Sequence, residues 1–126
     1  MPRFLSLDDV LESHAGQIAA YGGSDGIRDV GLLDSALAQP KAMFAGQYLH
    51  ADLLEMAAAY LFHLVQNHPF VDGNKRVGLE CALLFLEING HSVETTDEAL
   101  VGLVLQTAQG QATKQQIAEI FRTHVA

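Results

Sequence analysis

Two segments in the middle of the chain are apolar on almost every side when they are placed on a helix. The first runs from Asp52 to about Asn67, and the second runs from Lys75 to Asn89. A helix at the surface keeps one polar face, so a helix that is apolar all round belongs in the interior. The sequence therefore predicts two buried central helices joined by one short polar loop.

Weaker helical patterns surround this pair, and strand patterns are nearly absent. Three Ser or Thr residues precede an acidic or amide side chain by three positions, the spacing of a helix-capping box: Ser6 with Asp9, Thr95 with Glu98, and Thr113 with Gln116. A short helix through Leu32 and Leu37 must end before Pro40. Residues 41–50 have no helical face and predict a loop or a small hairpin. The expected fold is an all-α helical bundle.

Length and composition favour a single domain that covers residues 1–126. Apolar residues make up 49% of the chain and charged residues 17%, which is enough apolar surface to close one core. The formal net charge of −8 opposes binding to the phosphate backbone of nucleic acids. No apolar stretch approaches the roughly 18 residues needed to span a bilayer, and the N-terminus lacks the pattern of a signal peptide. We therefore expect a cytoplasmic protein that binds neither nucleic acid nor membrane.

The loop between the two predicted core helices concentrates polar and charged groups; residues 68–76 read His-Pro-Phe-Val-Asp-Gly-Asn-Lys-Arg. Gly73 lets the backbone turn tightly and approach a ligand. The helix that starts near Lys75 offers unpaired N–H groups, and Lys75 and Arg76 add positive charge, so this end predicts an anion site. Asp72 supplies a hard oxygen ligand of the kind that Mg²⁺ takes beside nucleotide phosphates. An imidazole can take up a proton near neutral pH, which makes His68 a candidate general base.

This loop resembles the motif of the Fic family, His-x-Phe-x-Asp/Glu-Gly-Asn-x-Arg. Six positions match: His68, Phe70, Asp72, Gly73, Asn74 and Arg76. Four stretches nearer the N-terminus resemble the Doc (death-on-curing) branch of that family: Tyr21–Gly23, Gly26–Asp29, Gly31–Leu33 and Ala36–Pro40. The resemblance covers essentially the whole chain and implies the Fic fold, a helical bundle with a small flap.

Two departures from the Fic pattern bear on the reaction. Fic enzymes that transfer AMP have Gly before the arginine of the motif and a second Arg three residues after it, whereas this chain has Lys75 and Leu79 at those positions. The resemblance to Doc toxins implies that ATP binds in the reversed orientation and gives up its terminal phosphate. In that branch the acceptor is a threonine of translation elongation factor Tu, and protein synthesis stops.

The resemblance also implies a role for each residue of the site. His68 would deprotonate the target hydroxyl, Asp72 would hold Mg²⁺, and Phe70 would lock the loop into the core. Contacts with the phosphates of ATP would come from four neighbours: Gly73, Asn74, Lys75 and Arg76. Phe44 and Tyr48 would belong to a flap that binds an extended target peptide by strand addition.

The resemblance further implies how such a toxin is controlled. Self-inhibited Fic proteins carry a Ser/Thr-x-x-x-Glu-Gly/Asn helix, and no Ser or Thr of this chain has Glu four residues later. Inhibition would then come in trans from a small antitoxin of the Phd type, whose disordered tail would fold on binding.

Two other functions stay open at this level. A Fic-type AMP transferase is disfavoured by Leu79, and an idle Fic domain that acts only as a binding module is disfavoured by the intact motif. The other histidines lack the spacing of metal ligands and are expected to be structural: His14, His50, His63, His91 and His124. Glu55 and Glu80 lie on or near the central helices, and one of them is a weaker candidate for a residue that orders the loop. Cys81 is expected to be a small buried apolar residue.

Overall fold

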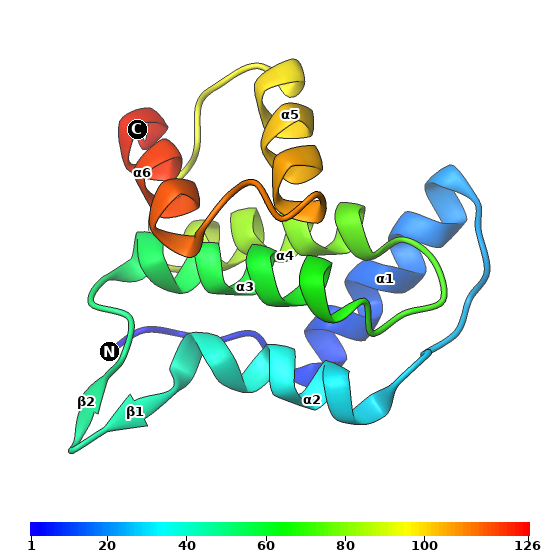
Figure 1. Cartoon of the computed structure of the whole chain (residues 1–126), viewed down its shortest axis with the longest axis horizontal. Coiled ribbons are helices and arrows are strands. Elements are labelled where there is room, and N and C mark those ends of the chain that lie inside the picture. Colours follow the sequence, from blue (N-terminus) through cyan, green and yellow to red (C-terminus); the bar gives the residue numbers. More distant parts are fainter.

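A computed structural model describes all 126 residues. Six α-helices, one short 3-10 helix and a two-stranded hairpin follow one another along the chain (Figure 1). Their bounds are α1 Leu7–Tyr21, α2 Val30–Ala38, η1 Gln39–Lys41, β1 Met43–Phe44, β2 Gln47–Tyr48, α3 Leu53–Asn67, α4 Asn74–Ile88, α5 Asp97–Ala108 and α6 Lys114–His124. The expected all-α bundle is confirmed, and no helix is both long and apolar enough to cross a membrane.

Helix α3 is the centre of the molecule, as its sequence predicts. Residues 56–61 are buried without interruption, on every side of the helix. Helix α2 lies on one side of α3, and α5 and α6 lie on the other (Figure 1). Helix α4 lies beside α3 and packs on its other side against α1. Because every flank of α3 meets another helix, this helix has no polar face.

Helix α4 is buried along one face only. Gly78 on this face allows α3 and α4 to approach closely, since a Cβ at that position would lie 2.9 Å from Val65 Cγ2 and 3.3 Å from the carbonyl oxygen of Leu61. Beside this buried face α4 carries a second apolar stripe, which includes Leu79 and Leu83. It packs against the edge of the core but stays half-buried. The sequence could not separate these two stripes, because both are apolar and both have helical spacing.

Local hydrogen bonds explain where the outer helices begin. The predicted capping boxes of Ser6 with Asp9 and of Thr113 with Gln116 are both present. The third prediction is wrong by one residue: helix α5 starts at Asp97, so the Thr96 hydroxyl accepts from the Ala99 N–H at 3.1 Å. An N-cap must immediately precede the first helical residue, which excludes Thr95.

The hairpin pairs Met43 with Tyr48 and Phe44 with Gln47. Its two turn residues, 45 and 46, both have positive φ, as in the tight turns that match strand twist. The Tyr48 ring lies 5.6 Å from that of Phe4, whereas the Phe44 side chain is 75% exposed. The hairpin leads into the N-terminal end of α3, so it lies at the opposite end of that helix from His68 (Figure 1).

Candidate active site

Two residues in left-handed conformation delimit the polar loop. Helix α3 ends just before His68, with φ 51° and ψ 54°, and helix α4 starts after Gly73, with φ 85° and ψ 9°. Glycine adopts this conformation without a Cβ clash, which explains Gly73, but a histidine there is strained by about 1 kcal/mol. The reversal at His68 leaves this residue exposed at the surface.

Phe70 and Asn74 hold the loop from within. The Phe70 ring is fully buried, as predicted for the residue that locks the loop. The Asn74 amide is also buried: its Oδ1 accepts from the Phe70 N–H at 2.9 Å, and its Nδ2 donates to the Phe70 carbonyl at 3.0 Å. The Asn74 side chain thus holds the loop together, while its backbone N–H stays free. The phosphate contact expected of Asn74 stays a prediction, and this N–H is the group left to make it.

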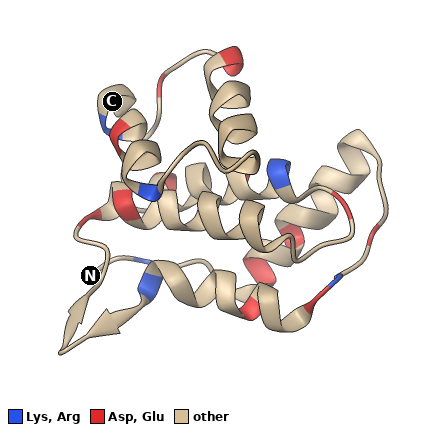
Figure 2. Ribbon diagram, viewed as in Figure 1, with Lys and Arg blue, Asp and Glu red and all other residues tan.

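The first turn of α4 is an anion-binding end with free donors. The N–H groups of Asn74, Lys75 and Arg76 donate to no acceptor in the protein, and the first bond of the helix runs from Val77 to the Gly73 carbonyl. Such groups, with the positive end of the helix dipole, favour a bound anion. Lys75 is exposed at the same turn. The whole chain has 7 Lys and Arg residues against 15 Asp and Glu residues, coloured blue and red in Figure 2. The positive charge predicted at the start of α4 is therefore confined to this turn of a chain whose net charge is −8.

Asp72 and Arg76 are tied to the glycine-rich turn that follows α1. The Ser24 N–H donates to Asp72 Oδ2 at 2.7 Å, and Arg76 Nη2 donates to the Gly22 carbonyl at 3.2 Å. Gly23 lies so close that a Cβ there would be 3.1 Å from the Asp72 Cβ, and its φ is 111°. This turn therefore sets where the Asp72 carboxylate points.

One hollow of about 530 Å³ brings most of the predicted site residues together. Its lining is Val65, His68, Val71, Asp72, Gly73, Asn74, Lys75, Arg76 and Ala108. An exposed imidazole, one carboxylate and two cationic side chains thus share one space. Phe44 and Tyr48 are not part of it, because the 15 residues of α3 span about 22 Å between the hairpin and His68.

The donor set of this hollow fits Mg²⁺ better than a transition metal. Asp72 is its single carboxylate, and Asp72 Oδ1 accepts no hydrogen bond within the protein. No group of three His, Cys, Asp or Glu side chains stands close enough to hold a metal by protein ligands alone. One carboxylate beside an anion-binding turn matches an ion that takes its other ligands from phosphates and water.

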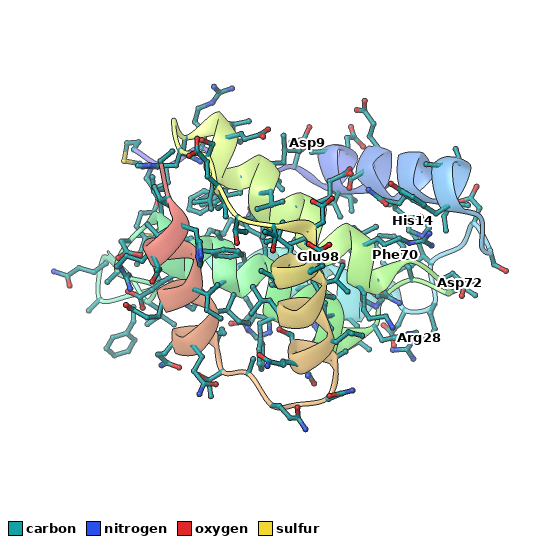
Figure 3. The ribbon with its side chains drawn as sticks, turned by 90° about the horizontal axis from the view of Figure 1, so that it is seen from above. Asp9, His14, Arg28, Phe70, Asp72 and Glu98 are labelled. Atoms are coloured by element: carbon teal, nitrogen blue, oxygen red, sulfur yellow. The ribbon has the colours of Figure 1, made fainter.

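His14 and Arg28, for which the sequence predicts no catalytic role, contact the loop from outside. Figure 3 labels them together with Phe70 and Asp72. The His14 ring is stacked on Phe70, with centroids 3.9 Å apart, and its Nε2 lies 2.9 Å from the Asp72 carbonyl oxygen. Arg28 Nε donates to the His68 carbonyl at 2.6 Å, and its Nη2 donates to the Asn67 carbonyl at 2.9 Å. Neither partnership has a local sequence signal, since the partners are 39 to 58 positions apart.

Two residues near the loop have ordinary structural roles. Glu80 accepts from the Ser13 hydroxyl at 2.6 Å and from Gln17, so it joins α4 to α1 and does not contact the loop. Burial raises the pKa of the Cys81 thiol to about 12, which excludes a thiolate nucleophile at neutral pH.

The fold and the site together define a class of protein: a small helical domain whose two central helices are joined by a loop that can hold a phosphate group beside a histidine. Comparison with known proteins identifies the family. The chain matches the model of the Fic/DOC family over residues 4–86 and belongs to that family.

Two known proteins are similar to this chain over most of their length. The chain is 47% identical to the protein named Toxin Doc of Mycolicibacterium smegmatis over 90 residues, which is 71% of this chain and 67% of the relative. It is 33% identical to the protein named Protein kinase doc of Escherichia phage P1 over 120 residues, which is 95% of this chain and 94% of the relative. The second similarity covers the whole site as well as the helices around it.

Proposed function

We propose that this protein is a Doc-type toxin that transfers the terminal phosphate of ATP to a hydroxyl group of a protein. The observation that carries the proposal is the common hollow, whose lining includes His68, Asp72 and the first turn of α4 with its free N–H groups. The names of the two relatives, a toxin and a protein kinase, support the same reading.

Each group in the hollow suits one part of phosphoryl transfer. His68 takes the proton of the attacking hydroxyl while the bond from that oxygen to the γ-phosphorus forms and the bond to the β-phosphate oxygen breaks. The free N–H groups, Lys75 and Arg76 bind the phosphate oxygens, which is the positioning that this reaction requires. Mg²⁺, when bound at Asp72, neutralises charge on the phosphates.

A second, apolar hollow supports transfer of the terminal phosphate over transfer of AMP. It has a volume of about 170 Å³, adjoins Lys75 and Arg76, and is otherwise lined by Leu79, Val101, Val104 and Leu105. Leu79 stands where AMP-transferring Fic enzymes carry a second arginine. An apolar wall can receive a nucleobase but cannot bind a phosphate, so the triphosphate tail is expected at the α4 turn.

Position-specific labelling tests the reaction. The protein is incubated with Mg²⁺, a bacterial lysate and ATP labelled at either the γ- or the α-phosphate. Label that reaches protein from the γ position alone is the expected result, and label from the α position alone would make the protein an AMP transferase. Mass spectrometry of the labelled protein then tests whether the target is translation elongation factor Tu.

Growth of cells that express the protein tests the toxin role. Expression of the wild type in the cytoplasm is expected to arrest growth, and His68→Ala is expected to abolish the arrest. If both proteins arrest growth equally, the domain acts by binding and not by catalysis.

A groove next to Arg76 suits the antitoxin that a toxin of this type requires. It has a volume of about 660 Å³ between α1 and α4, with a half-buried apolar floor that includes Leu79, Leu83 and Leu84. We expect the tail of a Phd-like antitoxin to bind there. Leu83→Glu should weaken binding of the antitoxin at least 10-fold, whereas Leu49→Glu, on an exposed leucine near the hairpin, should not change it.

A further inference from the structure

The catalytic loop is held from outside by the segment that links α1 to α2. The N–H groups of Arg28 and Asp29 donate to the Pro69 carbonyl at 2.7 and 3.0 Å, and the Val71 N–H donates to the Gly26 carbonyl at 2.9 Å. Ile27 and Phe70 form an antiparallel bridge between these bonds. This backbone pairing fixes the middle of the loop, and two side chains, Arg28 and His14, reach its two ends.

Arg28 acts on the end of the loop that carries His68. The last carbonyls of a helix have no partners within it and carry the negative end of the dipole, so a guanidinium with two donors suits them well. The bonds to Asn67 and His68 fix the peptide on which the imidazole stands. They also offset part of the strain of the left-handed His68 conformation.

His14 acts on the end that carries Asp72. Its side chain is almost fully buried, and a carbonyl oxygen can only accept, so the Nε2–H of His14 donates to Asp72. The planes of His14 and Phe70 are within 8° of parallel, which prevents the ring from tilting away. On its other side, Nδ1 lies 4.0 Å from the exposed Asp25 carboxylate. The His14 ring thus contacts both Phe70, which anchors the loop in the core, and the backbone of Asp72, which carries the single carboxylate of the hollow.

We propose that Arg28 and His14 are positioning residues of the phosphotransfer site with separate tasks. Arg28 orients the general base, His68, and His14 places the Asp72 carboxylate for a divalent cation bound to the nucleotide. The inference rests on the proposed function. It goes beyond that function because it assigns a separate kinetic effect to each residue. Arg28 should affect kcat, and His14 should affect the dependence on Mg²⁺.

Kinetic constants should separate the two roles. Arg28→Gln removes the paired donors and should lower kcat about 10-fold or more while the KM for ATP changes less than 2-fold, because a small displacement of a reacting group is costly. Arg28→Lys, which keeps the charge and a donor group but not the paired fork of the guanidinium, should restore part of kcat. Arg3→Gln is the matched control, since the Arg3 side chain is exposed and makes no hydrogen bond.

His14→Phe keeps the stacked ring and loses the donor. It should raise the Mg²⁺ concentration for half-maximal transfer about 10-fold, the usual size of an effect on a metal ligand through its neighbour. His14→Gln can still donate to the Asp72 carbonyl and should recover part of this affinity. His91→Phe is the matched control, because the His91 ring makes no hydrogen bond and follows the far end of α4.

A binding measurement without turnover completes the test. Calorimetry with a non-hydrolysable ATP analogue should show weaker binding to His14→Phe in Mg²⁺ and equal binding to wild type in EDTA, while Arg28→Gln binds as wild type in both. Thermal unfolding confirms that each variant is folded, and His14→Gln replaces His14→Phe if the latter is not.

The outcomes distinguish the inference from the function on which it rests. If the wild type transfers phosphate and the folded variants keep its kcat and its Mg²⁺ dependence, the positioning roles are wrong. Equal loss of binding in Mg²⁺ and in EDTA would also overturn the role of His14, because the effect would then be general. If the wild type itself transfers no phosphate, the proposed function fails, and calorimetry in Mg²⁺ still decides whether His14 supports the cation site.

Discussion

His68 combines an exposed imidazole with a backbone conformation that suits glycine. The residue follows the last turn of α3, where a left-handed residue commonly ends a helix. A histidine at that position is unfavourable for stability, and the role proposed for its imidazole as general base would account for its presence there. Strain of this kind is common at functional sites, where the surrounding contacts hold the residue in place.

Two variants of His68 distinguish the backbone strain at this residue from the catalytic role proposed for its imidazole. His68→Gly and His68→Ala both lack the imidazole and should both lose phosphotransfer. Only glycine tolerates the left-handed backbone, so His68→Gly should be more stable than His68→Ala by about 1 kcal/mol. Urea denaturation of the two proteins checks this difference, and equal midpoints would show that the conformation is not strained.

Replacement of Asn74 should lower the stability of the fold more than it weakens the binding of substrate. Asn74→Ala leaves the buried N–H and carbonyl of Phe70 without partners, and each such loss costs about 1–3 kcal/mol. We expect Asn74→Ala to unfold at clearly lower urea concentration than the wild type. A variant with unchanged stability and weakened ATP binding would instead support the phosphate contact predicted from the sequence.

At the scale of the elements, the close crossing of α3 and α4 sets the distance between the two ends of the loop. Gly78 is the residue that permits it, because the nearest atoms of Val65 and Leu61 leave no room for a methyl group. Val65 is β-branched and stiff in a helix, and the Leu61 contact is backbone, so neither can move aside freely.

Two glycines on helices should therefore respond oppositely to alanine. Gly78→Ala gains helix propensity but overpacks the interface, and we expect a net loss of about 1–2 kcal/mol of stability. Gly102→Ala on α5 has nothing within 4 Å of the new Cβ and should stabilise the protein by about 0.5–1 kcal/mol. Thermal unfolding measures both, and Val65→Ala should rescue Gly78→Ala if the clash is the cause.

For the whole molecule, a second group of titratable residues lies away from the site, near the start of α6. Burial, then Lys114 and His50, lower the pKa of His63 to about 4, and Lys114 Nζ lies 3.2 Å from His63 Nε2. Burial and Lys114 also lower the pKa of His50, against an opposing effect of Glu55. Both rings are therefore held neutral in the folded protein at neutral pH.

Acid should weaken the fold through this group. Between pH 6.5 and about 4 the unfolded chain takes up protons that folded His63 does not, so the free energy of unfolding falls as the pH falls. The shift corresponds to about 3 kcal/mol at most, and solvent screening of a half-buried ring reduces this to about 1–2 kcal/mol. Urea denaturation at pH 7, pH 5 and pH 4 measures the loss, which continues down to the folded pKa of about 4.

Variants of the same group test the cause. His63→Gln cannot titrate, so its stability should depend less on pH over this range. Lys114→Met removes a cation that opposes protonation and should have the same effect to a smaller degree. An unchanged pH dependence in His63→Gln would assign the acid sensitivity to other residues.

Local sequence was sufficient for most of the helices and for the loop that carries the motif. Apolar periodicity and capping spacing act over a few residues, so they predicted α3, the start of α1 and a loop or small hairpin between residues 41 and 50. The motif likewise placed His68, Asp72 and Arg76 within nine positions, and these residues line one hollow.

The tertiary structure alone decided the surroundings of that loop. His14 and Arg28 meet residues about 40 to 60 positions away because α1 and the segment after it pack against α4 and the end of α3. The same packing buries one stripe of α4, leaves Leu79 and Leu83 half-exposed, and puts Phe44 at the far end of α3. Which faces meet depends on the combined burial of all the helices, and no local pattern contains that information.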